Sequence, residues 1–418
     1  MKKERGITLV ALVVTIVVLL ILAGISLNLA IGNEGILTRS KEATNKYEKQ
    51  AENEQQGLNN VDDWMDEQFG DTGMKKVTVN TKATKNGTIN GQEPNINNPI
   101  IPKGYTPINA GSATWGNGNS SPAPSSIDNG LVIKDDNNNE WVWIPVEASV
   151  LSGMYASSNE GIALSGDVGV TTKMYTKTTT IGRTGDTVTL PRSTPNTTEV
   201  REPDLVTDYD KDEAYYKTIL GVNTPKTMAE AFTSDYANMI ASIQKYGGFY
   251  IGRYELSKEG VQKGKATLTN KNWYELYKKC TTLNASEKVE SRMIWGIQWD
   301  LVCDFISKKG DQKSITNSTT WGNCSDSTGS AAVMDGTTQK YGSKQVTGYS
   351  EYWKANNIYD LAGNCYEWTQ EAVSTFRRAI RGGFYNISGS VIPAYFCGWS
   401  GAISVSSDNL RFSSHFNN

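Results

Sequence analysis

The sequence begins with an uncharged apolar run that constrains where the rest of the chain can fold. Residues 7–30 carry no charge over 24 positions, and a helix rising 1.5 Å per residue would make them about 36 Å long. The hydrocarbon core of a bilayer is about 30 Å thick, so this run can span it. Lys2, Lys3 and Arg5 precede the run, and the positive-inside rule keeps such an end in the cytoplasm. We therefore expect a single-pass membrane anchor, with residues 31–418 outside the cytoplasm at the cell surface.

Two kinds of export signal are alternatives to a plain anchor. The run of residues 7–30 is longer than the 7–15-residue apolar region of an ordinary signal peptide. The basic leader, residues 1–6, ends in Gly6 and resembles the class III signal of type IV pilin-like proteins, which implies cleavage after Gly6. Pilins carry a glutamate at the fifth residue after that point, where this chain has Ala11. Pilus-type assembly, as a minor pilin-like structural or adhesive subunit, is therefore kept as an alternative to simple anchoring.

Two polar stretches separate this run from the rest of the chain. Over residues 31–70, apolar residues recur at spacings of three, four and seven among Lys, Glu, Gln and Asn, which predicts a polar helical stalk. Residues 71–99 are rich in Gly, Asn and Thr and predict a linker. Residues 100–418 would then form the head. The apolar stripe of the stalk consists of Ala43, Tyr47, Ala51, Leu58, Val61 and Met65.

The predicted head has many short aromatic segments punctuated by glycine. All but one of the 11 tryptophans lie in it, and the exception is Trp64. Such segments are typical of short strands, whereas longer helical patterns occur only over residues 227–246 and 299–308. The Thr-rich stretch 171–191 predicts a β-hairpin with Gly-Asp at its turn. The fold class expected for the head is α+β with irregular loops. The aromatic segments are residues 141–146, 247–255, 293–300, 357–371 and 381–385.

Composition excludes several classes of function. His415 is the only histidine of the sequence, which argues against Ser-His-Asp and Cys-His catalysis and against histidine-rich zinc sites. The net charge is -3, and a nucleic-acid-binding chain normally carries a basic excess, so no nucleic-acid partner is expected. The five cysteines form no CxxC pair, so the sequence has neither a zinc knuckle nor a thioredoxin motif.

Five motifs in the head occur in the order found in one known family. Together they resemble the formylglycine-generating enzyme/sulfatase-modifying-factor family, whose fold is an elaborated C-type-lectin-like fold. The resemblance covers about 300 residues and implies that fold for the head. The motifs are Trp143-Ile144-Pro145-Val146, the segment from Phe249 to Glu255, Gln298-Trp299-Asp300, the segment from Asn357 to Asn364 with Glu367-Trp368, and Arg381-Gly382-Gly383.

The resemblance does not extend to the family's catalytic cysteines. The family's oxidase binds copper with two cysteines close together after the RGG motif, whereas residues 384–392 contain none and Cys397 stands alone. Cu(I) prefers paired soft ligands. We therefore expect neither copper nor enzymatic activity. An oxidase with altered metal ligands is kept as the less favoured alternative.

The same resemblance implies a calcium site. In the family, calcium is often held at the turn that corresponds to Asp360, Gly363, Cys365 and Glu367 of this sequence. Calcium prefers several oxygen ligands, and here two carboxylates and two backbone carbonyls would supply them. The alternative is a turn whose carboxylates only form hydrogen bonds to the backbone.

The end of the chain has an unusual composition. Residues 382–418 contain no Lys, Glu, Gln or Met, although these types make up 74 of the 418 residues. At that rate about six or seven would be expected among these 37 residues. Most of the residue types present can arise from an Asn codon by replacement of adenines. This pattern resembles the variable region of retroelement-diversified proteins, in which randomised template adenines change the surface of a C-type lectin fold.

These features predict a membrane-anchored ligand-binding protein displayed at the cell surface. Aromatics mixed with small polar residues are typical of adaptable binding surfaces, and such a surface is expected within residues 384–408. The alternative for each of these aromatics is core packing, which is favoured for Trp399. The partner could be a protein or a glycan. The candidate ligand-binding residues are Phe384, Tyr385, Ile387, Tyr395, Phe396 and Trp399.

Overall fold

The computed structural model divides the chain into two compact units, Met1–Thr72 and Gly73–Asn418, and the described residues all belong to the second unit. The predicted membrane helix and stalk therefore lie outside the described residues. Within the described part, no helix has the length and apolar character needed to cross a bilayer. The described residues are 74–108, 127–155, 179–181, 183, 188–190, 228–283, 289–328, 341–374, 377–401, 409–410 and 412–416.

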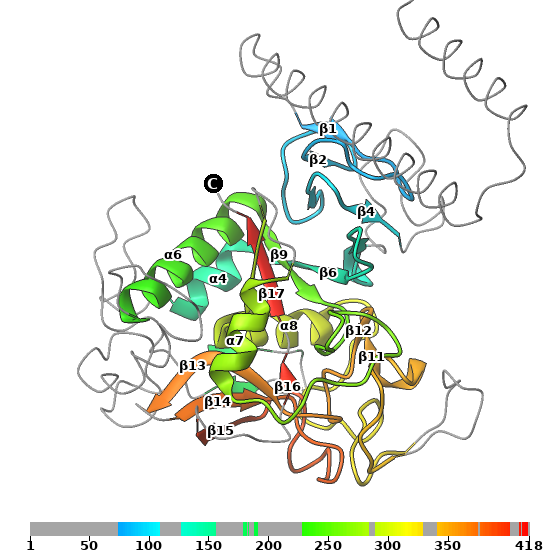
Figure 1. The fold of residues 1–418 in the computed structure, drawn as a ribbon, viewed down its shortest axis with the longest axis vertical. Helices are drawn as coiled ribbons and strands as arrows, with labels where there is room; N and C mark the ends of the chain where they lie inside the picture. Colours follow the sequence, from blue (N-terminus) through cyan, green and yellow to red (C-terminus); the bar gives the residue numbers. More distant parts are fainter. Residues whose placement is uncertain are drawn as a thin grey trace, which may run out of the picture. The chain divides into compact units, whose positions relative to one another are not determined.

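The main sheet has six strands, all antiparallel to their neighbours, in the order β10-β17-β9-β6-β5-β4. Figure 1 labels four of them, β4, β6, β9 and β17. β6 carries the WVWIP sequence, and its four central residues are buried because they are covered on both faces. The strands are β4 (Thr106–Pro107), β5 (Val132–Lys134), β6 (Glu140–Pro145), β9 (Gly248–Gly252), β10 (Val289–Met293) and β17 (Phe412–Phe416).

The C-terminal strand β17 lies inside this sheet. Its residues pair with β10 on one side, from Val289 opposite Phe416 to Met293 opposite Phe412. On the other side Ser413 lies opposite Ile251 of β9. Residues 412–416 are therefore structural, although they share the unusual composition of the candidate binding segment.

A second sheet of four strands has the order β15-β14-β13-β16. The β13–β14 and β14–β15 pairs are antiparallel, and β16 is parallel to β13. The 384–408 segment thus leaves the sheet after β14, passes through β15 and returns at β16. These strands are β13 (Glu367–Ser374), β14 (Arg377–Arg381), β15 (Cys397–Gly401) and β16 (Asn409–Leu410).

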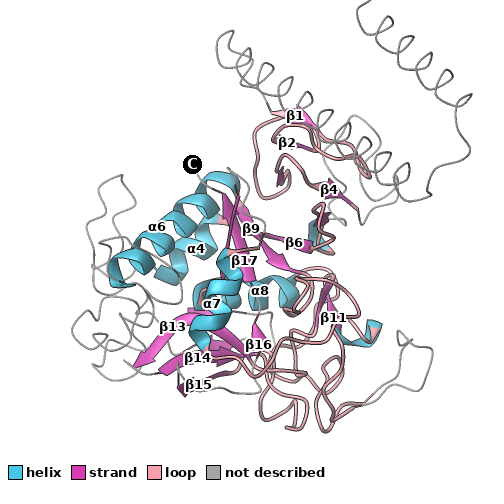
Figure 2. Cartoon of the chain, viewed as in Figure 1, coloured by secondary structure: helices cyan, strands magenta, loops and turns pink. Residues whose placement is uncertain are grey.

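Four α-helices are described, and three of them, α6, α7 and α8, pack against the two sheets. α6 contacts β9 and β17, α7 contacts β10, and α8 contacts both β6 and β13, so α8 joins the two sheets (Figures 1 and 2). The predicted helix over 227–246 is confirmed as α6, and the one predicted over 299–308 is confirmed with an earlier start. The helices are α4 (Ala148–Tyr155), α6 (Met228–Tyr246), α7 (Trp273–Thr281) and α8 (Gly296–Lys308).

Helix α7 was not expected from the sequence, although its start is encoded locally. Asn272 is the N-cap: its side chain accepts a hydrogen bond from the backbone N–H of Glu275, whose carboxylate in turn accepts from the N–H of Asn272. This reciprocal capping box satisfies two donors that a helix start otherwise leaves unpaired.

Small strand pairs complete the described elements. The predicted Thr-rich hairpin is confirmed in its two strands, because β7 (Thr179–Ile181) pairs antiparallel with β8 (Val188–Leu190). Residues 171–178 and the expected Gly185-Asp186 turn lie outside the described residues. Another hairpin, β11 (Lys354–Ala355) with β12 (Ile358–Tyr359), follows the 3-10 helix η2 (Glu351–Trp353). Residues 309–328 contain turns, bends and one isolated bridge in place of helices or strands. The α+β class with irregular loops is thus what the structure has (Figure 2).

Residues 74–99 are folded where a linker was expected. They contribute β1 (Lys75–Lys76) and β2 (Gly87–Thr88) to a small sheet with β3 (Ile100–Ile101). Asparagine side chains support their loops: Asn98 Nδ2, for example, donates to the backbone carbonyls of residues 92 and 93. Asn-rich composition is compatible with ordered turns because Asn side chains bond to nearby backbone groups.

The core of the head is built around tryptophans. Five of the most buried ones lie in the aromatic segments of the sequence, and the other three lie in α7, in η2 and in the loop 309–328. Burial of these side chains is the core packing that was kept as the alternative role of the aromatic motifs. The tryptophans with less than 2% of their surface exposed are Trp141, Trp143, Trp273, Trp295, Trp299, Trp321, Trp353 and Trp368.

Candidate functional site

Two glycine-containing turns bring the RGG motif against the 357–364 motif. The backbone N–H of Gly363 donates to the carbonyl oxygen of Gly382 at 2.6 Å. Gly363 has a φ of +81°, and a Cβ there would overlap the carbonyl oxygen of Asn323. Gly383 has a φ of +87°, and a Cβ there would press on the carbonyl oxygen of Ile392. Glycine is required at both positions, because any side chain would separate these backbones.

Asn364 connects the turn to four other segments. Its side-chain Oδ1 accepts from the backbone N–H of Gln345 at 2.9 Å and from Asn323 Nδ2 at 3.1 Å. Its Nδ2 donates to Glu255 Oε2, and its backbone carbonyl accepts from the N–H of Tyr385 at 3.1 Å. Asn364 is fully buried. It therefore fixes the point at which the candidate binding segment begins.

The fully buried carboxylate of Glu255 lies behind Asn364. Its Oε2 also accepts from Thr267 Oγ1 at 3.2 Å, and its Oε1 accepts from the backbone N–H of Cys365 at 3.1 Å. Burial, together with the nearby Glu255 carboxylate, raises the pKa of the Cys365 thiol well above its ordinary value. Cys365 is therefore a protonated, buried thiol.

The four predicted calcium ligands lie on one turn and the strand that follows it. Asp360 is buried with a φ of +57°, and its Oδ2 accepts from the backbone N–H of Gly348 at 2.8 Å. Glu367 is fully buried at the start of β13, opposite Arg381. Within the described ranges, no group of three or more His, Cys, Asp or Glu side chains is arranged to hold a metal. The bond from Gly348 is the backbone contact expected of a structural turn, and calcium binding there stays a prediction.

The first part of the candidate binding segment is held by residues outside it. Asp326 Oδ1 accepts from the backbone N–H of Gly389 at 2.7 Å, and its Oδ2 accepts from the hydroxyl of Ser388. Partial burial would raise the pKa of Asp326, but these hydrogen bonds lower it on balance. Ser318 donates its N–H to the carbonyl of Gly389 at 2.9 Å, and its Oγ accepts from the N–H of Ala394 at 2.9 Å.

Further contacts fix the backbone on either side of these points. The carbonyl of Ile387 accepts from the N–H of Ser325 at 3.0 Å, and the N–H of Tyr395 donates to the carbonyl of Ile315 at 3.3 Å. Trp299 Nε1 donates to the carbonyl of residue 394 at 3.0 Å. Apart from the Ser388 hydroxyl, these contacts use backbone atoms of the segment. Most of its side chains are therefore not needed to hold its path.

Four aromatic rings gather on this segment and the turn beside it. The rings of Tyr366 and Phe384 are stacked, with centroids 5.3 Å apart and planes 7° apart. Phe384 also contacts Tyr385, with centroids at 4.3 Å, and Phe396 lies 6.1 Å from Tyr366. Phe384 is 9% exposed, and the other three are partly exposed. We call Tyr366, Phe384, Tyr385 and Phe396 the aromatic cluster.

The structure unites three of the six predicted binding residues in this cluster and adds Tyr366, which was missed. Tyr366 lies between Cys365 and Glu367, two residues that the sequence had already singled out. That position was the signal from which Tyr366 could have been included. Ile387 and Tyr395 are partly exposed on the same segment, and Tyr395 packs against the core. Trp399 lies in β15, opposite Ala379 of β14; its side chain and residues 402–408 lie outside the description.

Beneath the segment is a buried ion pair. Arg381 Nη1 lies 3.3 Å from Asp300 Oδ1, and both side chains are 1% exposed. The same Nη1 is 3.5 Å from the carbonyl oxygen of Tyr395. The RGG arginine thus links helix α8 to the candidate binding segment.

A charged cluster around Tyr359 predicts how stability responds to acid. Glu351 accepts from Lys263 Nζ and Tyr359 OH, both at 2.7 Å, and from Lys354 Nζ at 3.0 Å. Partial burial opposes ionisation, but these bonds lower the pKa of Glu351 to about 2. The stabilisation is complete above the unfolded-state pKa of about 4.3 and is lost as pH falls toward 2. The side chain of Glu351 is 41% exposed, so this stabilisation amounts to about 0.5–1 kcal/mol.

We therefore expect Glu351→Gln to reduce the acid sensitivity of folding. Urea unfolding at pH 7 and pH 2.5 should give a smaller loss of unfolding free energy for the variant, by about 0.5–1 kcal/mol. An equal loss in variant and parent would contradict the assigned contacts of Glu351.

Comparison with protein-family models gives no match for this sequence, and comparison with curated proteins gives no significant relative.

Proposed function

We propose that the chain is a ligand-binding protein anchored in the cell membrane by residues 7–30, whose head binds its ligand at the cell surface. The binding surface is the aromatic cluster together with other side chains of residues 384–408. The observation that carries this proposal is that residues 385–395 are held almost entirely through their backbone. Side chains on such a segment are free to serve recognition, and aromatics among small polar residues suit that role.

A C-type-lectin-like fold and a non-catalytic role belong to the same proposal. The α+β architecture is compatible with that fold, and the RGG and 357–364 motifs meet in the turn that supports the segment. Binding is favoured over oxidase chemistry because residues 384–392 lack the cysteine pair that copper would need. Calcium at Asp360 is tested by thermal unfolding with added calcium and with a chelator.

Diversification of the segment by a retroelement is the proposed source of its composition. A nearby reverse transcriptase gene and a near-copy of codons 380–412 that differs only at adenines would support it. The structure of β17 adds a condition: variation should stop before Phe412, because residues 412–416 form a central strand.

The binding surface is tested by removing its rings. The full chain in lipid nanodiscs should bind glycans on an array or proteins on a surface-protein array, and the Tyr385→Ser/Phe396→Ser variant should lose at least about tenfold in affinity. Losses of this size are typical when aromatic anchors are truncated. Tyr352→Ser is the matched control, since Tyr352 is a partly exposed tyrosine of η2.

Equal binding by the parent chain and the double variant would place the binding surface elsewhere. The minor-pilin alternative makes a different prediction, namely immunogold labelling of pili or loss of filaments when the gene is deleted. Extraction from membranes by carbonate would contradict anchoring by residues 7–30.

A further inference from the structure

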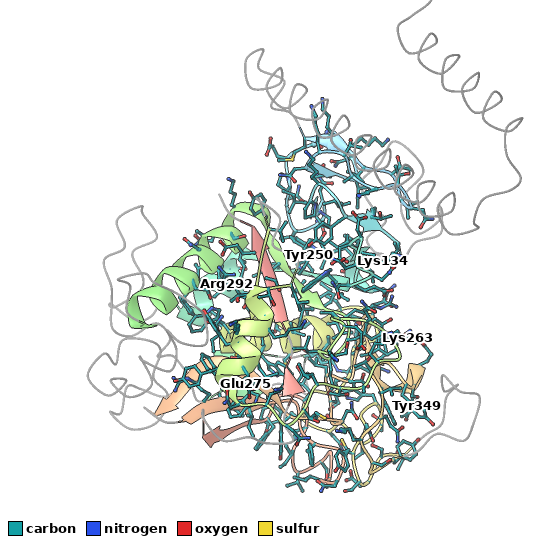
Figure 3. All side chains as sticks on the ribbon, in the orientation of Figure 1. Lys134, Tyr250, Lys263, Glu275, Arg292 and Tyr349 are labelled. Atoms are coloured by element: carbon teal, nitrogen blue, oxygen red, sulfur yellow. The ribbon has the colours of Figure 1, made fainter. Side chains whose placement is uncertain are left out.

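An open pocket of about 480 Å³ lies beside helix α7, apart from the aromatic cluster. Pockets of this volume accommodate small molecules. Its lining combines two leucines with five charged side chains, and Figure 3 shows one of them, Glu275, on α7. The lining residues are Lys258, Leu268, Lys271, Glu275, Leu276, Lys278 and Lys279.

The carboxylate of Glu275 in this pocket is already paired. Glu275 Oε1 accepts from Lys271 Nζ at 2.8 Å, and its Oε2 accepts from the backbone N–H of Asn272 at 3.0 Å. The hydrogen bond from Lys271 is the main reason that the pKa of Glu275 is lowered. The Lys271–Glu275 pair therefore contributes no net charge to the pocket.

Three further lysines line the pocket. Among the described residues, Lys258, Lys278 and Lys279 have no carboxylate within ion-pair distance. Lysines in the last turn of a helix interact favourably with its dipole, which accounts for Lys278 and Lys279 as stabilising residues. The helix dipole does not explain why Lys258 lies beside these two lysines, because Lys258 belongs to the loop after β9. It also does not explain the pocket itself, whose lining includes leucines.

We propose that this pocket binds a small organic anion with an apolar body. The three lysines attract its carboxylate, sulfate or phosphate group, and the partly exposed Leu268 contacts its apolar part. The pocket is positive in a chain whose net charge is -3, so the attraction is local to this face of α7. The site is independent of the aromatic cluster and of the proposed function.

The probe is 2-naphthoate, which combines one carboxylate with an apolar ring system. Isothermal titration calorimetry with the full chain in nanodiscs should detect binding that weakens as sodium chloride is raised. 2-Naphthamide has the same rings without the charge and should bind at least tenfold more weakly. The Lys258→Gln/Lys278→Gln/Lys279→Gln variant should raise the Kd for 2-naphthoate at least tenfold.

The matched control changes three lysines outside the pocket: Lys76→Gln/Lys134→Gln/Lys313→Gln alters the net charge equally and should leave the Kd unchanged. Equal affinities of the two triple variants would overturn the proposal, because attraction would then come from overall charge. Equal binding of naphthoate and naphthamide would overturn it as well. A cooperative thermal transition in each variant confirms that the comparison is made on folded protein.

Discussion

Deleting residues 412–418 is expected to abolish the cooperative folding of the head. The deletion removes β17, which pairs with β10 over five residue pairs and with β9 on its other side. The two neighbours would lose their pairing and expose strand edges in the middle of the main sheet. Helix α6 would also lose the strand that it contacts beside β9. Since domains are stable by only about 5–15 kcal/mol, loss of a central strand should exceed what the fold tolerates.

Deletion of residues 417–418 alone is the control, because these two residues follow β17. Near-ultraviolet circular dichroism and urea unfolding should show a native transition for this control and none for the longer deletion. A longer deletion that still unfolds cooperatively, with the parent's midpoint, would contradict the central position of β17.

The parts of the fold that the sequence predicted are those encoded by local patterns. The periodicity of α6 and the alternating Thr-rich hairpin each lie within a short stretch, and both are present. The capping box of Asn272 and Glu275 was an equally local signal for α7, and a search for that spacing would have found the helix.

The parts that were not predicted depend on contacts between distant segments. Glu255 and Asn364 are 109 positions apart, and Asp326 and Ser388 are 62 apart, yet these pairs support the candidate binding segment. Nothing in local periodicity indicates that β17 would insert between β9 and β10. The candidate aromatics Phe384, Tyr385 and Phe396 could be named from composition alone, whereas their contact with Tyr366 required the RGG turn to be placed against the 357–364 turn.

The second large effect is expected at the ion pair between Asp300 and Arg381. Both side chains are 1% exposed, so Asp300→Leu would leave the Arg381 guanidinium buried without this carboxylate. Removing one partner of a buried pair typically costs about 3–5 kcal/mol, because the remaining charge is not compensated. Urea unfolding at pH 7 should give a loss of unfolding free energy in that range. Asp304→Asn on the same helix breaks the more exposed pair with Lys308 and should cost less than about 1 kcal/mol.

The double variant Asp300→Leu/Arg381→Met decides whether the loss reflects the pair itself. Apolar replacement of both partners removes the buried charge altogether, so much of the stability lost in Asp300→Leu should return. Strictly additive losses would show that the two residues are not coupled. Arg381 also lies 3.5 Å from the carbonyl of Tyr395. The double variant has no guanidinium at position 381, so this contact with the binding segment is lost in it. We therefore expect the double variant to recover stability without recovering ligand affinity.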